Sequence, residues 1–185
     1  MPNSVEQVVR ILAQCLREGY TVDIDGLGIF RPTRHGYEFQ PRTAPRVFLA
    51  YVREDLEQVE RLYRALRRRG YDPWLDRKKL LPGQDWPRAI QRAIELADFF
   101  IACFSSRAVR KRGEFQSELR YALECARRLP LDELYLLPVR LDDCAVPARV
   151  SREIQYVDLF PDWHGGIRRL VAALESARSR RPKAA

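Results

Sequence analysis

Short apolar segments that alternate with amphipathic stretches determine the fold class of most of this chain. From Arg46 onward, apolar runs of strand length occupy residues 47–51, 71–75, 99–105, 134–139 and 156–159. Between them, apolar residues recur at helical spacing, as in Leu56, Val59, Leu62, Tyr63 and Leu66. Unbroken apolar strands are typical of a parallel sheet that is buried on both faces. The pattern therefore predicts a doubly wound α/β domain.

The first forty residues follow a different pattern and predict a separate small α+β unit. Apolar residues from Val5 to Leu16 repeat at helical spacing, and Gly19 is placed to end that helix. Apolar and polar residues alternate over 21–24, as in a strand, and Asp25-Gly26 is a hairpin turn signal. Residues 27–30 are then expected to form the returning strand of the hairpin. Residues 37–39 add a third short strand. We expect unit boundaries at 1–43 and 44–177, with a frayed basic tail at 178–185.

The stretch REGYTVDIDGLGIFRP resembles the helix and hairpin of the histone-like HU and integration-host-factor proteins, which bend DNA. This chain has no preceding helical hairpin and no long basic arm, and residues 1–45 hold five basic and five acidic residues. Proteins of that kind hold DNA mainly by neutralising phosphates. We therefore expect DNA binding to be weak or absent, and rank dimerisation or partner binding ahead of it.

Composition excludes several classes of protein. The chain has 185 residues, of which 46% are hydrophobic and 31% charged, so it is globular. Half of its net charge of +8 lies in the C-terminal tail, which favours a solvated Arg-rich surface over a nucleic-acid site. Four cysteines without CxxC spacing and two histidines predict reduced thiols and no metal site. With no apolar run of membrane length and no leader pattern, we expect a cytoplasmic protein that does not contact membranes.

The stretch GYDPWLDRKKLLPGQDW carries a candidate contact loop. It joins a short apolar strand to a helix that Asp85 can cap, with Pro87 in the first turn. A basic, partly apolar loop in this place is suited to be a ligand lid or a docking surface, and a solvated connection explains it equally well. The residues expected to form an interface are Arg77, Lys78, Leu80, Leu81, Pro82 and Gly83.

A ligand site is expected beyond the carboxyl ends of the first and third strands. In open α/β sheets ligands bind where the strand order reverses. Residues 51–55 and Ser105-Ser106 lie at those ends, and the next helix brings Glu118. Glu118 flanks the apolar stripe of that helix, so its carboxylate is partly desolvated and suited to stabilising charge. An ordinary rim glutamate, paired with Arg120, Arg127 or another neighbour, is the alternative.

Four motifs in order resemble the Toll/interleukin-1 receptor (TIR) domains, in the style of bacterial members. They are RVFLAYVRED, YDPWLDRKKLLPGQDW, FFIACFSS with GEFQSELRYALE, and FPDW, and they cover residues 46–177. The resemblance implies a flavodoxin-like five-stranded parallel sheet. It also implies one of two functions: cleavage of NAD⁺ to nicotinamide and a linear or cyclic ADP-ribose product in immune or stress signalling, or scaffolding through TIR–TIR contacts.

For NAD⁺ cleavage, the resemblance makes Glu118 the catalytic carboxylate. One carboxylate suffices because nicotinamide leaves as a neutral molecule and needs no general acid. NAD⁺ is then the substrate, no bound cofactor is expected, and self-association completes the site. Where the family often has a tryptophan four residues before this glutamate, this chain has Glu114. The remaining substrate-binding candidates are Tyr51 and Trp74 beside a ring, Arg53 and Lys79 at the pyrophosphate, Ser105 near the ribose, and Trp86 covering the cleft.

Overall fold

The computed structural model describes residues 4–24, 28–41, 44–75, 85–130 and 133–180. The chain divides into two compact units, Met1–Ala44 and Pro45–Ala185. The predicted boundary between residues 43 and 44 lies one residue from this division. The first is the N-terminal unit and the second is the α/β unit.

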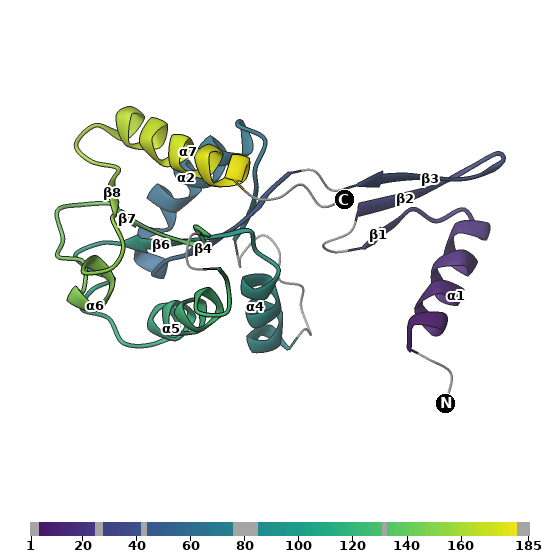
Figure 1. The fold of residues 1–185 in the computed structure, drawn as a ribbon, viewed down its shortest axis with the longest axis horizontal. Coiled ribbons are helices and arrows are strands. Elements are labelled where there is room, and N and C mark those ends of the chain that lie inside the picture. The colour runs from purple at the N-terminus through teal and green to yellow at the C-terminus, as the bar shows by residue number, and fades with distance from the viewer. Residues whose placement is uncertain (1–3, 25–27, 42–43, 76–84, 131–132, 181–185) are drawn as a thin grey trace. The chain divides into compact units, whose positions relative to one another are not determined.

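The α/β unit is built on a parallel sheet of five strands (Figure 1). Taken along the chain, the strand order across the sheet is second, first, third, fourth, fifth, which confirms the predicted flavodoxin-like arrangement. All of its neighbouring strands pair in parallel. The strands are β4 (Arg46–Ala50), β5 (Asp72–Trp74), β6 (Phe99–Phe104), β7 (Leu136–Arg140) and β8 (Val157–Asp158), in the order β5-β4-β6-β7-β8.

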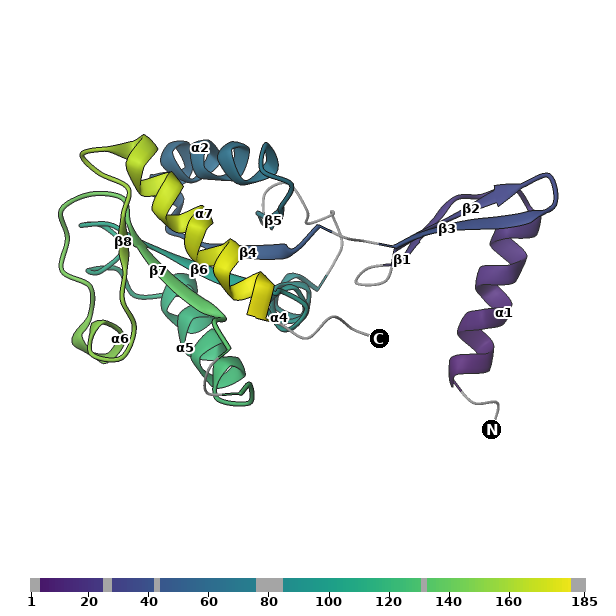
Figure 2. The same ribbon diagram turned by 45° about the horizontal axis from the view of Figure 1, so that its top comes forward.

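Helices cover both faces of this sheet, as Figures 1 and 2 show. Helices α2 (Leu56–Arg67) and α7 (Trp163–Arg180) pack on one face, and α4 (Trp86–Glu95), α5 (Glu114–Ala126) and the short α6 (Ala148–Ser151) pack on the other. The central strand β6 divides its side chains between the two apolar clusters. Phe99, Ile101 and Cys103 belong to the first cluster, and Phe100, Ala102 and Phe104 to the second. Every β6 side chain is buried, which explains the unbroken apolar run in the sequence.

The helix ends follow the local signals of the sequence. Asp85 caps α4 by accepting a hydrogen bond from the backbone N–H of Arg88, and Pro87 lies in the first turn. Gly70 follows α2 with φ +79°, a conformation that other residues rarely adopt. Helix α6 and a 3₁₀ turn, η1 (Arg53–Asp55), were not expected, because elements of three or four residues carry no periodicity. Helix α7 continues to Arg180, three residues past the predicted end of the domain.

The N-terminal unit contains one helix and an antiparallel sheet in the order β1-β2-β3. Its elements are α1 (Ser4–Arg17), β1 (Val22–Ile24), β2 (Gly28–Thr33) and β3 (Gly36–Pro41). The predicted helix, hairpin and third strand are all present, although the Asp25-Gly26 turn lies outside the described residues. None of the described helices of either unit combines the length and apolar composition that a membrane span requires.

Candidate functional site

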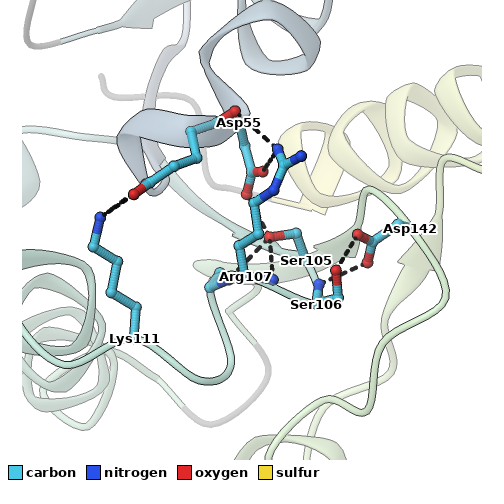
Figure 3. Close-up of polar contacts among 8 residues, drawn as sticks. Asp55, Ser105, Ser106, Arg107, Lys111 and Asp142 are labelled. Carbon is cyan, nitrogen blue, oxygen red and sulfur yellow. Dashed lines mark hydrogen bonds and ion pairs between the residues drawn. The ribbon is translucent and has the colours of Figure 1, made fainter.

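The carboxyl ends of β4 and β6 lie side by side, because these two strands are neighbours in the sheet. The chain leaves β4 through the turn η1, and it leaves β6 through a loop, residues 105–113, that leads into α5. Polar side chains from both connections meet at this edge (Figure 3). The observed strand order thus brings together the two segments at which the sequence predicted a ligand site.

A buried hydrogen bond between Asp55 and Ser105 joins the two connections. Only 2% of Asp55 and 1% of Ser105 are exposed. The Ser105 hydroxyl donates to Asp55 Oδ2 at 2.5 Å, and it accepts from the backbone N–H groups of Arg107 and Ala108 at 3.2 and 3.0 Å. With three partners, the hydroxyl is fully occupied. Ser105 therefore fixes the start of the 105–113 loop against η1.

Cations of the 105–113 loop reach back to η1. Arg107 Nη1 lies 3.4 Å from Asp55 Oδ1 and donates to the Glu54 carbonyl at 3.1 Å, while 64% of the Arg107 side chain remains exposed. Lys111 Nζ lies 2.5 and 2.8 Å from the two Glu54 carboxylate oxygens. These contacts position the exposed Arg107 guanidinium beside the carboxyl ends of the strands, where it can meet an anionic ligand.

A third connection is tied to the same edge by Asp142, which follows β7. The backbone N–H and the hydroxyl of Ser106 donate to the two Asp142 carboxylate oxygens, each at 2.8 Å. The loops after the first, third and fourth strands of the sheet are thus linked by side-chain hydrogen bonds (Figure 3). Such links give the site a rigid frame.

The pKa values of the two carboxylates of η1 shift in opposite directions. Burial raises the pKa of Asp55, and the hydrogen bond from Ser105 and the charge of Arg107 oppose that rise. The hydrogen bond from Lys111 lowers the pKa of Glu54, which stands in solvent. Asp55 is too buried to meet a substrate directly, so its role is to position the loop.

Glu118 lies on α5, the helix that continues the 105–113 loop. Its side chain is half-buried, and the neighbouring Phe115 and Leu119 are each 4% exposed. The predicted position at the border of the apolar stripe is therefore confirmed. Phe115 packs edge-on against Phe104, with ring centroids 5.5 Å apart, so the aromatic residue nearest to Glu118 belongs to the core. Glu114, at the position of the family's tryptophan, is exposed at the first residue of α5.

Tyr51 and Trp74, the two proposed ring contacts, pack on opposite faces of the sheet. Tyr51 packs against the apolar cluster under α2 and α7. Trp74 packs against the other cluster, and its ring stacks on Phe48 at a centroid distance of 4.8 Å. The structure does not bring these two rings together around one ligand.

The other predicted site residues have varied positions. Arg53 is exposed at the start of η1, next to Glu54 and Asp55. Trp86 is 46% exposed at the start of α4. Lys79 and the expected interface residues of the loop, Arg77, Lys78, Leu80, Leu81, Pro82 and Gly83, lie outside the described residues. Within the described part of the chain, no three His, Cys, Asp or Glu side chains gather as metal ligands would.

Asp55, Arg107 and Asp142 belong to the site but were not among the predicted site residues, although Asp55 ends the predicted segment 51–55. Asp55 and Asp142 each follow an apolar strand by a few residues, and that polar position after a strand was the signal that could have found them. Their pairing with Ser105 and Ser106 depends on which strands are neighbours. No local pattern in the sequence reveals it.

A surface pocket of about 910 Å³ lies away from these residues. It is bounded by the last turns of α5 and α7 and by the start of β7, at the amino end of the strand. Asp55, Ser105 and Glu118 do not line it. The candidate site is therefore defined by its polar contacts and its place on the sheet.

Comparison with known proteins gives the family. A search of curated proteins found no significant match. The TIR domain of the Toll-related receptor TRR-2 from Hydra magnipapillata superposes with a TM-score of 0.56 at 21% identity, covering 71% of this chain and 97% of that one. The TIR-STING receptor of C. gigas, solved with 2′,3′-cGAMP, gives 0.55 at 18% identity and covers 68% of this chain but 38% of the receptor. At these identities the likeness shows the fold alone.

The family model of the TIR domain matches residues 47–171, which is more than half of the chain and falls within the α/β unit. It does not reach the N-terminal unit, for which the resemblance to HU proteins stays a prediction. The match spans all five parallel strands and the connections that carry Asp55, Ser105 and Glu118. The chain therefore belongs to the TIR domain family.

Proposed function

We propose that this protein is an NAD⁺ glycohydrolase that becomes active when its TIR domains self-associate. The observation that carries the proposal is the position of Glu118, a half-buried carboxylate on α5 in a chain of the TIR family. Its place between two buried apolar side chains supports a role in which a desolvated negative charge faces developing positive charge. Roles in immune or stress signalling follow from the resemblance to bacterial family members.

In this proposal Glu118 stabilises charge and does not protonate the leaving group. The bond between the ribose C1′ and the nicotinamide nitrogen breaks, and its electron pair passes to the ring nitrogen, which becomes neutral. Glu118 stabilises the oxocarbenium-like ribose and holds its hydroxyls. Water then adds at C1′ and releases a proton, which gives ADP-ribose; attack by the adenine of the same molecule would give a cyclic product instead.

The polar frame around Asp55 supports substrate binding in this proposal. Arg107 is held by Asp55 and the Glu54 carbonyl while most of its side chain stays exposed, so its charge is available to a pyrophosphate. Arg53, exposed in η1, is a second cation at the same edge. Asp55 and Ser105 act as positioning residues, because their polar atoms are already engaged.

The test is release of nicotinamide from NAD⁺ by the purified protein at low and high protein concentration. Glu118→Gln keeps the shape of the side chain and removes its charge, so it should lower the rate on the order of a hundredfold or more. Glu124→Gln is the matched control, because it makes the same change at an exposed position of α5. We expect the control to keep the rate of the unmodified protein.

A rate that rises more steeply than the protein concentration would support activation by assembly. Equal rates for Glu118→Gln and the unmodified protein would contradict the catalytic assignment. Absence of nicotinamide release at every concentration would favour the alternative, a non-enzymatic adaptor that works through TIR–TIR contacts.

A further inference from the structure

The described residues of the N-terminal unit form no fully buried core. Of its residues whose burial is described, Gly28 is the one buried residue, and no apolar side chain among them is fully buried. The α/β unit, by contrast, buries an apolar cluster on each face of its sheet. Units of about 40 residues rarely fold without a disulfide, a metal or a partner. Cys15, the sole cysteine of this unit, is a free thiol.

Helix α1 leaves half of its apolar stripe uncovered. Leu12, Cys15 and Leu16 in its second half are partly buried, and α1 contacts β1 and β2. In its first half, Val8, Val9 and Ile11 are 58%, 57% and 55% exposed. Figure 2 shows the cause, since the amino-terminal half of α1 extends away from its own sheet. The stripe is thus longer than the sheet that covers it.

Strand β3 adds exposed aromatic surface to the same unit. The register places Phe39 opposite Phe30 and Tyr37 opposite Pro32, so both aromatic residues of β3 stand on one face of the sheet. Tyr37 is 63% exposed and Phe39 is 39% exposed. β3 is also an edge strand. Large exposed aromatic and aliphatic side chains within one small unit indicate an interaction surface.

We propose that a second copy of this chain covers Val8, Val9, Ile11, Tyr37 and Phe39, so that two N-terminal units form one folded dimer. A unit without its own core needs a partner that is always present at matching concentration, and a second copy meets that condition. The five side chains offer an apolar area on the order of 500 Å² per chain, and a two-fold pair would bury about twice that, close to the lower limit for a specific interface.

Charge also favours a second copy over a nucleic acid. The unit holds five basic and five acidic residues, so two copies do not repel each other as a whole. A nucleic acid would need a surplus of cations that this unit lacks. The proposal concerns a different surface from Glu118 and does not depend on NAD⁺ cleavage.

The test is the molar mass of the full-length chain by sedimentation equilibrium from about 1 to 100 µM. We expect the unmodified chain to be dimeric or larger within this range, and the double variant Val8→Glu/Ile11→Glu to dissociate at least tenfold more readily. Arg10→Glu is the matched control, because it changes the charge by the same two units at an exposed position on the side of α1 away from Val8. It should leave the mass unchanged.

A second measurement does not rely on the charged variant folding. Ile11→Cys should form disulfide-linked dimers under mild oxidation, well above the yield from the unmodified chain, because the copies present α1 to each other. Arg10→Cys, an exposed position on the side of the helix away from Val8, should give less. A monomer at 100 µM, with or without affinity for duplex DNA, would overturn the proposal. A dimer that the double variant leaves intact would overturn it as well, since its interface would lie elsewhere.

Discussion

The carboxylates of Asp55 and Glu118 have different environments. Asp55 is 2% exposed and bound by Ser105 and Arg107, while Glu118 is half-buried beside the apolar face of α5. A carboxylate with its oxygens already engaged holds structure together. Glu118 keeps part of its surface exposed, as the proposed catalytic role requires.

The buried position of Asp55 should be visible in the pH dependence of stability. Because burial raises its pKa, the folded protein keeps the Asp55 proton at pH values where the unfolded chain has lost it. The stability contribution is full below the ordinary Asp pKa of about 3.9 and is lost as the pH rises through the higher folded value. Asp55→Asn cannot titrate. Urea denaturation across this window should therefore show the unfolding free energy of the unmodified protein falling relative to that of the variant.

Ser105→Ala is the companion variant. The hydrogen bond from Ser105 opposes the rise in the pKa of Asp55, so its removal should extend the fall in stability to higher pH. A difference between Asp55→Asn and the unmodified protein that does not change with pH would contradict this account of Asp55.

At the scale of the elements, helix α7 packs closely against the end of the edge strand β8. The backbone of Gly166 allows this approach, since a Cβ atom there would lie 2.3 Å from the Asp158 carbonyl oxygen and 2.8 Å from Leu159 Cα. Both obstacles are backbone atoms that cannot rotate away. The first turn of α7 therefore tolerates no side chain at this position without moving from the sheet.

Gly166→Ala should consequently be less stable than Gly165→Ala. Both variants gain the same helix propensity, but the obstacle at Gly165 is the Asp162 carboxylate. This side chain can turn aside, and doing so costs only the hydrogen bond that it accepts from the Gly165 N–H. We expect the free energy of unfolding of Gly166→Ala to be lower by about 1–3 kcal/mol, as in an overpacked core. Chemical denaturation of both variants measures this difference. Equal stabilities would show that α7 shifts without cost.

At the scale of the whole molecule, the two units differ in how they are stabilised. Each face of the five-stranded sheet is covered by helices and an apolar cluster. The described residues of the N-terminal unit include no fully buried apolar side chain. Backbone amides open most easily where apolar burial is least.

The rate of amide hydrogen exchange should therefore differ between the two units. Amides of α1 and β1 to β3 should exchange much faster than those of β4, β6 and β7, and dilution should speed exchange in the N-terminal unit alone if a second copy protects it. Mass spectrometry of peptides from both units, at two protein concentrations, measures both effects. Uniform protection along the chain would contradict the division in stability.

Much of the fold could be predicted because its signals are local. The apolar run at residues 99–105 predicts β6 within one residue, and Asp85 with Pro87 predicts the start of α4. The N-terminal helix and hairpin follow from helical spacing and alternation in the same way. Elements without periodicity, η1 and α6, could not be predicted.

The sequence by itself determined the strand and helix pattern, the two units and the position of Glu118 beside an apolar stripe, because these depend on residues a few positions apart. The TIR motifs also pointed to the family. Only the tertiary structure decided that Asp55 meets Ser105, that Asp142 meets Ser106, and that Tyr51 and Trp74 pack on opposite faces of the sheet. Those contacts join segments 36 or more residues apart or depend on which face of the sheet a side chain occupies. They are set by strand order and packing, which local sequence does not encode.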